Sequence, residues 1–202
     1  MTRPKFYLIT LCMLLPLMAL SACSKTVQWE EEVLLNTGET IWVKRTVVYS
    51  AQGGAGNPLD IRYRPSRDDK IEFFWRGKNY LYNDAGGVKV LAISPHGLPI
   101  LVMNADAGAW DATTGYKCTI PFYVQFMPDA SGKIWTWPTR IESWLYNLPT
   151  NLLLDIPNPD KMRPRYTHKE KMTQTFWRDP MSKFMQRIDP DYTGDLCNKK
   201  EK

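Results

Sequence analysis

The chain has 202 residues, of which 44% are hydrophobic and 23% charged, and its mean hydropathy is −0.38. This profile is typical of a globular protein, and it excludes a disordered chain and a membrane protein with many spans. The 26 basic residues against 21 acidic ones leave a net charge of +5, a surplus too small to indicate a nucleic-acid partner by itself. The length fits one compact domain.

The first 22 residues have the pattern of a secretion signal. Arg3 and Lys5 precede an apolar stretch from Phe6 to Leu20, which is shorter than the about 20 residues that a transmembrane helix needs. The residues that follow read Leu20-Ser21-Ala22-Cys23. This run resembles the lipobox of bacterial lipoproteins. The alternative is a buried N-terminal helix in which the cysteine is incidental.

The resemblance implies a membrane anchor. In that family the chain is cut before the cysteine, whose thiol takes a diacylglycerol and whose new amino group is acylated, so Cys23 would carry the lipid. Members retained in the inner membrane typically have Asp after the cysteine, whereas this chain has Ser24, which implies the outer membrane facing the periplasm. We therefore expect a signal peptide over 1–22, the lipidated cysteine and a short tether over 23–26, and a single domain over 27–202.

Two cysteines remain after Cys12 leaves with the signal and Cys23 is lipidated. In an oxidising compartment Cys118 and Cys197 are predicted to form a disulfide, which would close a loop of roughly 80 residues. Two free buried thiols, or a reactive one, are the alternatives. The chain has no Cys-x-x-Cys pair that would indicate redox chemistry.

Alternating apolar residues predict a β-hairpin at the start of the domain. Residues 27–35 and 41–49 each place their apolar side chains on one face, and the residues between them have turn chemistry. Pairing Asn36 with Thr40 sets Glu31 opposite Arg45 on the apolar face. Because either charge alone would be costly to bury, we predict an ion pair between them.

Further strands are expected up to residue 137, and helices after it. The strand candidates are 71–75, 80–82, 88–93, 100–103, 116–127 and 134–137. From Thr139 the apolar period changes to 3.6, and capping boxes pair Thr139 with Glu142 and Thr167 with Glu170. A third helix is expected over 179–188. The predicted fold is α+β: an antiparallel sheet of β-hairpins over 27–137, followed by short C-terminal helices between 139 and 188.

No motif in the sequence assembles a catalytic or metal site. His96 lies in a proline-flanked turn and His168 at a helix start, and the hydrolase and metalloprotease motifs are absent. The run from Asp189 to Gly194 matches four positions of an EF-hand loop, but Lys200 stands where the bidentate Glu belongs. We therefore predict no catalytic residues, no metal and no cofactor.

Two sequence features are compatible with binding. Trp135 and Trp137 share one face of a strand and are a candidate partner-binding surface, with core packing as the alternative. Basic residues are dense near the third quarter of the chain, where they form either a polyanion-binding patch or a solvated face: Lys161, Arg163, Arg165, Lys169 and Lys171.

The run from Trp29 to Thr40 looks like uncharacterised proteobacterial lipoproteins, whose role is unassigned. The function we expect is a membrane-anchored, non-enzymatic binding or accessory module. Its partners would be the membrane, through the lipid on Cys23, and a protein or envelope polymer, but no nucleic acid. An envelope hydrolase with an unrecognised site and a purely structural lipoprotein are the alternatives.

Overall fold

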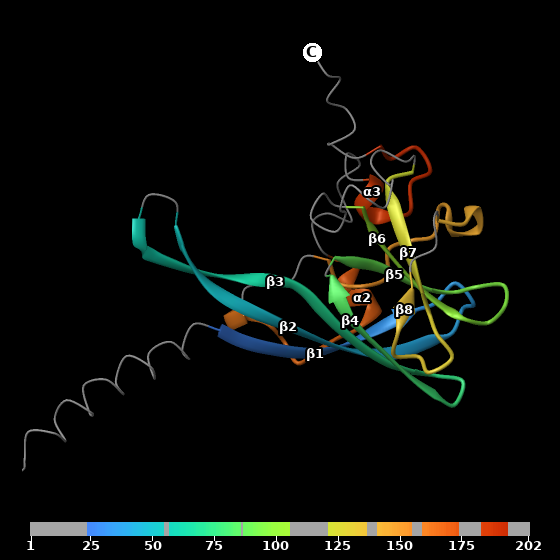
Figure 1. Ribbon diagram of the computed structural model, residues 1–202, viewed down its shortest axis with the longest axis horizontal. Coiled ribbons are helices and arrows are strands. Elements are labelled where there is room, and N and C mark those ends of the chain that lie inside the picture. Colours follow the sequence, from blue (N-terminus) through green and yellow to red (C-terminus); the bar gives the residue numbers. More distant parts are fainter. Residues whose placement is uncertain are drawn as a thin grey trace, which may run out of the picture.

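The computed structural model of the chain describes residues 24–54, 57–85, 87–105, 121–136, 141–154, 159–173 and 183–193. The nine strands in these residues are β1 Ser24–Leu34, β2 Thr40–Gly54, β3 Asn57–Trp75, β4 Lys78–Ala85, β5 Val88–Ile93, β6 Pro99–Asn104, β7 Tyr123–Pro128, β8 Trp135–Thr136 and β9 Arg165–Tyr166. They form a five-stranded sheet in the order β4-β3-β2-β1-β9 and a four-stranded sheet in the order β5-β6-β7-β8 (Figure 1). All pairs are antiparallel except β1 with β9.

The prediction of an α+β fold is wrong, because the regular structure is dominated by the two sheets. The helices in the described part of the chain are single turns: η2 Ser143–Leu145, η3 Pro159–Lys161, α2 His168–Lys171 and α3 Lys183–Gln186. A helix of one turn buries too little surface to form a layer of its own. In the described residues, the segments expected as helices form only single turns, joined by chain without regular structure.

Thr139, where a helix was expected to begin, lies outside the described residues, and the residues after it form only the single turn η2, because Glu142 is used elsewhere. Glu142 caps no backbone N–H with its side chain. Its carboxylate accepts hydrogen bonds from Gln125 Nε2 at 3.0 Å and from Trp144 Nε1 at 2.8 Å, and its backbone N–H donates to Gln125 Oε1 at 2.9 Å. These contacts hold the turn against β7. The hydrogen bonds to Gln125 therefore replace the predicted capping box.

The second capping box is confirmed. The Thr167 side chain accepts from the Glu170 backbone N–H, and the Glu170 carboxylate accepts from the Thr167 backbone N–H at 2.7 Å. The helix that it opens nevertheless has only four residues, and its last member, Lys171, is 2% exposed. This helix is therefore held in place by the partners of the buried Lys171 charge, and not by an apolar face of its own.

The first hairpin forms with a register different from the predicted one. Leu35 N–H donates to Glu39 O at 2.8 Å, so the turn closes around Asn36, Thr37 and Gly38. Gly38 has a φ of 85°, and a three-residue hairpin turn requires this left-handed conformation at its third residue. Glycine adopts this conformation without steric cost. Because the left-handed residue must be the third one of the turn, the position of Gly38 sets the register of the hairpin.

As a result, Glu31 lies opposite Val43 and not opposite Arg45. The pairing has moved by two residues, which keeps both charged side chains on the same face of the sheet. They are diagonal neighbours, and long side chains reach each other across that distance. The predicted ion pair is therefore confirmed, whereas the predicted register is wrong.

The core lies between the two sheets. Its buried side chains from the five-stranded sheet include Val33, Val43, Ile71, Phe73 and Tyr82, and those from the four-stranded sheet include Leu91, Leu101, Met103, Val124 and Phe126. The four-stranded sheet is buried on its other face as well, where Val90, Ile100 and Val102 pack against Ile141, Leu145 and Ile188. All six residues of β5 are therefore buried, which is why this strand has no polar side that faces water.

Side chains close two edges of the sheets. Asn36 bonds both the N–H and the carbonyl of Ile93, and Asn151 does the same for Leu91, so two amides pair with the outer edge of β5. Trp135 Nε1 donates to the carbonyl of Leu81 on β4 at 2.7 Å. Each contact satisfies a backbone group that an edge strand would otherwise leave unpaired.

A long hairpin projects from the five-stranded sheet. The pairing of β1 with β2 ends at Ser24 and Ser50, and the pairing of β4 with β3 ends at Ala85 and Asp68, but β2 and β3 continue. We call the part beyond these points, 50–54 and 57–67, the β2–β3 arm. It extends away from both sheets on the side where β1 begins (Figure 1).

Candidate functional site

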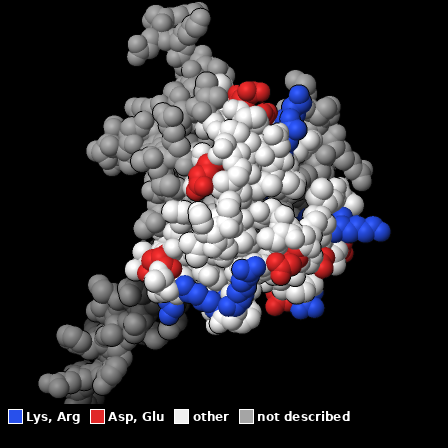
Figure 2. All heavy atoms as spheres, turned by 90° about the vertical axis from the view of Figure 1, so that its right-hand side faces the viewer, with Lys and Arg blue, Asp and Glu red and all other residues white. Residues whose placement is uncertain are grey.

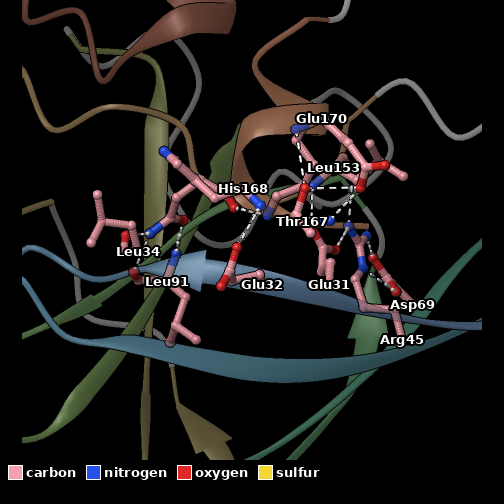
Figure 3. Close-up of polar contacts among 12 residues, drawn as sticks. Glu31, Glu32, Leu34, Arg45, Asp69, Leu91, Leu153, Thr167, His168 and Glu170 are labelled. Atoms are coloured by element: carbon pink, nitrogen blue, oxygen red, sulfur yellow. Dashed lines mark hydrogen bonds and ion pairs between the residues drawn. The ribbon is translucent and has the colours of Figure 1, made fainter. Parts of the chain in front are cut away.

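The most distinctive polar feature of the described residues is a buried group of four charged side chains. Glu31 of β1, Arg45 of β2, Asp69 of β3 and Lys171 of α2 are each no more than 2% exposed. We call this group the charge cluster (Figure 3). The alternation of β1 places it between two apolar clusters, because Trp29 packs on one side of Glu31 and Val33 on the other.

Arg45 is the centre of the charge cluster. Its Nε donates to Asp69 Oδ1 at 3.3 Å, its Nη2 contacts Asp69 Oδ2, and its Nη1 donates to Glu31 Oε1 at 3.2 Å. Nη1 also donates to the carbonyl of Leu153 at 2.7 Å, and the guanidinium lies 5.1 Å from the centre of the Trp29 ring. The planar fork of an arginine is suited to such convergent contacts.

Lys171 brings the C-terminal part of the chain to the sheet. Its Nζ donates to Glu31 Oε2 at 2.8 Å and to the carbonyl of Asn151 at 2.5 Å. The same Glu31 oxygen accepts from the backbone N–H of Leu153 at 2.8 Å. One carboxylate thus holds β1, the segment around 151–153 and α2 together.

The electrostatics of the charge cluster are balanced. Burial by itself lowers the pKa of Arg45, but the adjoining Asp69 and Glu31 outweigh it and hold the pKa above its ordinary value. Burial lowers the pKa of Lys171, and the attraction of Glu31 only partly offsets that effect. Two cations face two anions, so the group has no net charge to attract an ion. Its arrangement fixes loops on the sheet and offers no free group for acid–base chemistry.

A small cavity lies near the charge cluster, between the end of β1 and β5. Its volume is about 130 Å³, and its wall is mostly apolar, with Asn36, Asn151 and His168 as its polar residues. None of the four charged residues lines it. A space of this size accommodates a group about as large as benzene.

His168 is the titratable residue at this cavity. Its backbone N–H donates to Glu32 Oε2 at 2.9 Å, while its ring Nδ1 is buried and has no hydrogen-bond partner among the described residues. Burial and the nearby Lys171 lower the pKa of the ring below its ordinary value, and Glu32 partly opposes them. Among the residues that line this cavity, the other polar side chains are the amides of Asn36 and Asn151, so the described lining places no carboxylate, thiol or hydroxyl beside the ring.

The outer face of the five-stranded sheet exposes large apolar side chains. Leu34 is 39% exposed, Trp42 is 42% exposed and Phe74 is 59% exposed. Because Val43 pairs with Phe73, Trp42 and Phe74 take adjacent positions on this face. The guanidinium of Arg165 lies 4.6 Å from the centre of the Trp42 ring. We call Leu34, Trp42, Phe74 and Arg165 the outer patch.

The structure places one of the residues proposed for lipidation, disulfide formation or partner binding. Cys23, Cys118, Cys197 and Trp137 lie outside the described residues. Trp135 is partly buried, and its ring lies 5.8 Å from that of Tyr82 and 6.4 Å from that of Tyr80. This packing favours the core interpretation of Trp135, and the partner-binding site at Trp135 and Trp137 stays a prediction.

The basic residues that are dense in the sequence do not gather into one patch. Lys171 is buried in the charge cluster, Arg163 pairs with Glu170 at 2.9 Å, and Arg165 pairs with Glu30 at 2.5 Å. Opposite charges therefore neutralise three of the five. A solvated face with interspersed acids is the interpretation that these contacts favour.

Sequence reasoning missed the burial of Asp69 and Lys171 in the charge cluster, and it missed the outer patch. The alternation of β3 could have identified Asp69, because it lies two and four residues before the buried Ile71 and Phe73 and so faces the same side of the sheet. Alternation could also have identified Trp42 and Phe74, since it puts them on the face of the sheet opposite Val43 and Phe73. Lys171 has no local signal, because its partner Glu31 is 140 residues away.

Comparisons with known proteins assign no family: no family profile, curated protein or solved structure matches the chain. In the part of the chain that the structure describes, no three His, Cys, Asp or Glu side chains converge on a metal-sized site. No helix of those residues is long and apolar enough to cross a bilayer.

Proposed function

We propose that the chain is a lipoprotein of the bacterial cell envelope, cut before Cys23, anchored by the lipid on that residue, and acting as a non-enzymatic binding module. The lipobox-like run Leu20-Ser21-Ala22-Cys23 supports the anchor. Ser24 after the cysteine supports the outer membrane, facing the periplasm. The domain then presents its surface to partners at the membrane.

The observation that carries the proposal is that the residue directly after Cys23 is already paired in the sheet. β1 starts at Ser24, and Ser24 already pairs with Ser50 of β2. The tether expected over 23–26 is therefore largely part of the sheet. A folded sheet that includes the residue next to the lipid-bearing position is held at the membrane surface and cannot reach across the periplasm.

The outer patch is the surface that supports binding. It lies at the end of β1 away from Ser24, since Leu34 follows ten residues later, which corresponds to roughly 33 Å of strand. Trp and Arg side chains dominate the energetics of protein interfaces, and exposed aromatic pairs on a sheet face mark such sites. At this distance from the anchor the outer patch is available to a protein partner in the periplasm.

One experiment in cells tests both parts of the proposal. A photo-crosslinking amino acid replaces Phe74, and the same amino acid replaces the exposed Lys133 as a control. Cys23→Ser is combined with each, and clickable palmitate reports lipidation. We expect palmitate on the chain with Cys23 only, and a discrete crosslinked protein from position 74 but not from position 133.

Palmitate labelling and crosslinking distinguish a failure of the proposed anchor from a failure of the proposed binding surface. Palmitate labelling that persists in Cys23→Ser would refute the anchor. Labelling that depends on Cys23, together with identical crosslinks from positions 74 and 133, would refute the outer patch as the binding surface and leave the anchor in place.

A further inference from the structure

We infer that the cavity between the end of β1 and β5 receives one apolar side chain of the protein partner, with a phenylalanine ring as the group of matching size. We call this cavity, whose wall includes Leu34, Leu91, His168 and Met172, the β1–β5 cavity. The inference rests on the proposed binding at the outer patch. It deepens that proposal, because it identifies the part of the partner that is anchored.

The β1–β5 cavity adjoins the outer patch. Leu34 belongs to both, and it is an exposed residue. Met172, which directly follows α2, also lines the cavity and is 40% exposed. Figure 3 shows Leu34 of β1, Leu91 of β5 and His168 of α2 in this part of the molecule. Because residues that both line a cavity and contact solvent mark its opening, the cavity opens between the end of β1 and the end of α2.

An apolar path leads from this opening across the outer face of the sheet. Leu34 pairs with Thr40, so Leu34 and Trp42 are diagonal neighbours on one face. Phe74 takes the adjacent position to Trp42 on β3. A partner that covers Trp42 and Phe74 therefore lies over the opening of the β1–β5 cavity as well.

The wall of the cavity selects an apolar occupant. No Asp, Glu, Lys or Arg is among the residues that line it. The side-chain amides of Asn36 and Asn151 are already bonded to backbone groups of β5. A free metabolite with charged groups would lose its hydration there without gaining a partner. A protein side chain does not have this cost, because its polar backbone stays outside.

The size of the cavity selects one ring. Its volume of about 130 Å³ is close to that of an apolar cavity of about 150 Å³ that binds benzene. The ring of phenylalanine has the size of benzene, whereas the indole of tryptophan is larger. Single aromatic anchors that fill a pocket carry a large share of the binding energy of protein interfaces.

Charge is a weak selector at this end of the molecule. Figure 2 views the protein from the side to which β1 runs, and Leu34 is the last residue of β1. Over the described residues it shows Lys and Arg interspersed with Asp and Glu on a largely uncharged surface, with no region of a single sign. Shape and apolar contact therefore select the partner more than a long-range field does.

The binding of a ring is tested on the full-length lipidated protein in vesicles. Fluorobenzene is the probe, and 4-fluorobenzoate supplies the same ring with a charge. Fluorine NMR measures both, and protein-free vesicles give the partition into lipid. We expect fluorobenzene to bind at least tenfold more tightly than 4-fluorobenzoate, because the cavity wall offers no cation to the carboxylate.

Two variants close the cavity. Ala92→Leu enlarges a side chain of the wall, and Met172→Trp places a larger ring at the opening. Each is expected to weaken fluorobenzene binding at least tenfold. Ile134→Trp is the control, since Ile134 is exposed and does not line the cavity, and it is expected to leave binding unchanged. Circular dichroism reports folding, and Met172→Trp at its exposed position keeps the test decisive where Ala92→Leu does not fold.

The same variants test the partner's side chain in cells. They are introduced into the chain that carries the photo-crosslinking amino acid at position 74. We expect Ala92→Leu and Met172→Trp to reduce the discrete crosslinked product at least tenfold, because burial of one phenylalanine ring accounts for at least that factor in affinity. Ile134→Trp is expected to keep the full yield.

The possible failures are distinguishable. If fluorobenzene does not bind the wild-type protein, the inference is wrong and the outer patch stands. If fluorobenzene binds but both cavity variants keep the full crosslink, the cavity takes a free small molecule, and the partner's side chain is excluded as its occupant. Absence of a discrete crosslink from position 74 without any cavity variant would refute the outer patch and, with it, this inference.

Discussion

At the scale of single residues, the charge cluster explains how a polar group occupies the middle of an apolar sheet face. Glu31, Arg45, Asp69 and Lys171 interrupt the apolar pattern of four different elements, yet each charge has an opposite partner in direct contact. Carbonyls of Asn151 and Leu153 take remaining N–H groups of the two cations. Such a group adds specificity because only one arrangement of the loops satisfies every member.

Removing one member should therefore cost more than removing a surface ion pair. Arg45→Met leaves Asp69 buried without its arginine partner and Glu31 buried with Lys171 alone, and we expect a loss of about 3 to 5 kcal/mol in the free energy of unfolding, measured with urea. Lys25→Met removes the exposed pair with Asp160 and is expected to cost less than about 1 kcal/mol.

Arg45→Met is a severe change, so Arg45→Lys serves as a second variant. It keeps the charge and loses the two-pronged contact with Asp69, and its cost should lie between those of Arg45→Met and Lys25→Met. If both Arg45 variants unfold at the same urea concentration as Lys25→Met, the charge cluster contributes no more than a surface pair.

At the scale of elements, side-chain amides replace missing strands at the edge of β5. Asn151 donates to the carbonyls of Leu34 and Leu91 and accepts from the Leu91 N–H, so it joins β1 to β5. Asn36 makes the equivalent two bonds to Ile93, one step further along the same edge. These contacts also explain why β5 can be an edge strand with every residue buried.

The two asparagines form a matched pair for mutation. Asn151→Ala leaves buried backbone groups of Leu91 unpaired, and we expect it to lower the free energy of unfolding by about 2 to 4 kcal/mol. Asn36→Ala removes the same bonds at a more exposed site, where water replaces them, and should cost about 1 kcal/mol. Urea unfolding measures both, and faster exchange of the Leu91 amide in Asn151→Ala identifies the cause.

A smaller loss in Asn151→Ala than in Asn36→Ala would contradict this account of the edge. It would mean that the segment around residue 151 is held by its other contacts alone.

At the scale of the whole molecule, the four-stranded sheet is a central layer. The five-stranded sheet covers one of its faces, and the segments around 141–148 and 184–192 cover the other. A backbone hydrogen bond and a ring contact join the C-terminal segment to the residue that precedes β7. Phe122 N–H donates to the carbonyl of Tyr192 at 2.6 Å, and their rings lie 6.1 Å apart.

This contact supports the predicted disulfide. Cys118 is four residues before Phe122, and Cys197 is five residues after Tyr192, so both cysteines are close in sequence to residues that touch. We expect a non-reducing peptide map to show Cys118 joined to Cys197. Reduction is expected to lower the free energy of unfolding by about 4 kcal/mol, because the bridge closes a loop of roughly 80 residues. Alkylation of either cysteine before reduction would refute the bridge.

The sequence by itself determined the features that depend on neighbours along the chain. The alternation of β1 and β2 identified their buried face and the pairing of Glu31 with Arg45, and the capping box at Thr167 formed as its spacing predicts. These features are local because a period of two specifies which side chains share a face, and a capping box needs only three residues of spacing.

The tertiary structure decided the rest. Whether the C-terminal segments become helices depended on partners such as Gln125, which took the capping carboxylate of Glu142. Lys171 joined the charge cluster from 140 residues away, and Asn151 became a substitute for a strand. Periodicity states that a face is buried, but not which distant segment covers it. That choice follows from the hydrogen bonds and charges that each segment must satisfy once the sheets have formed.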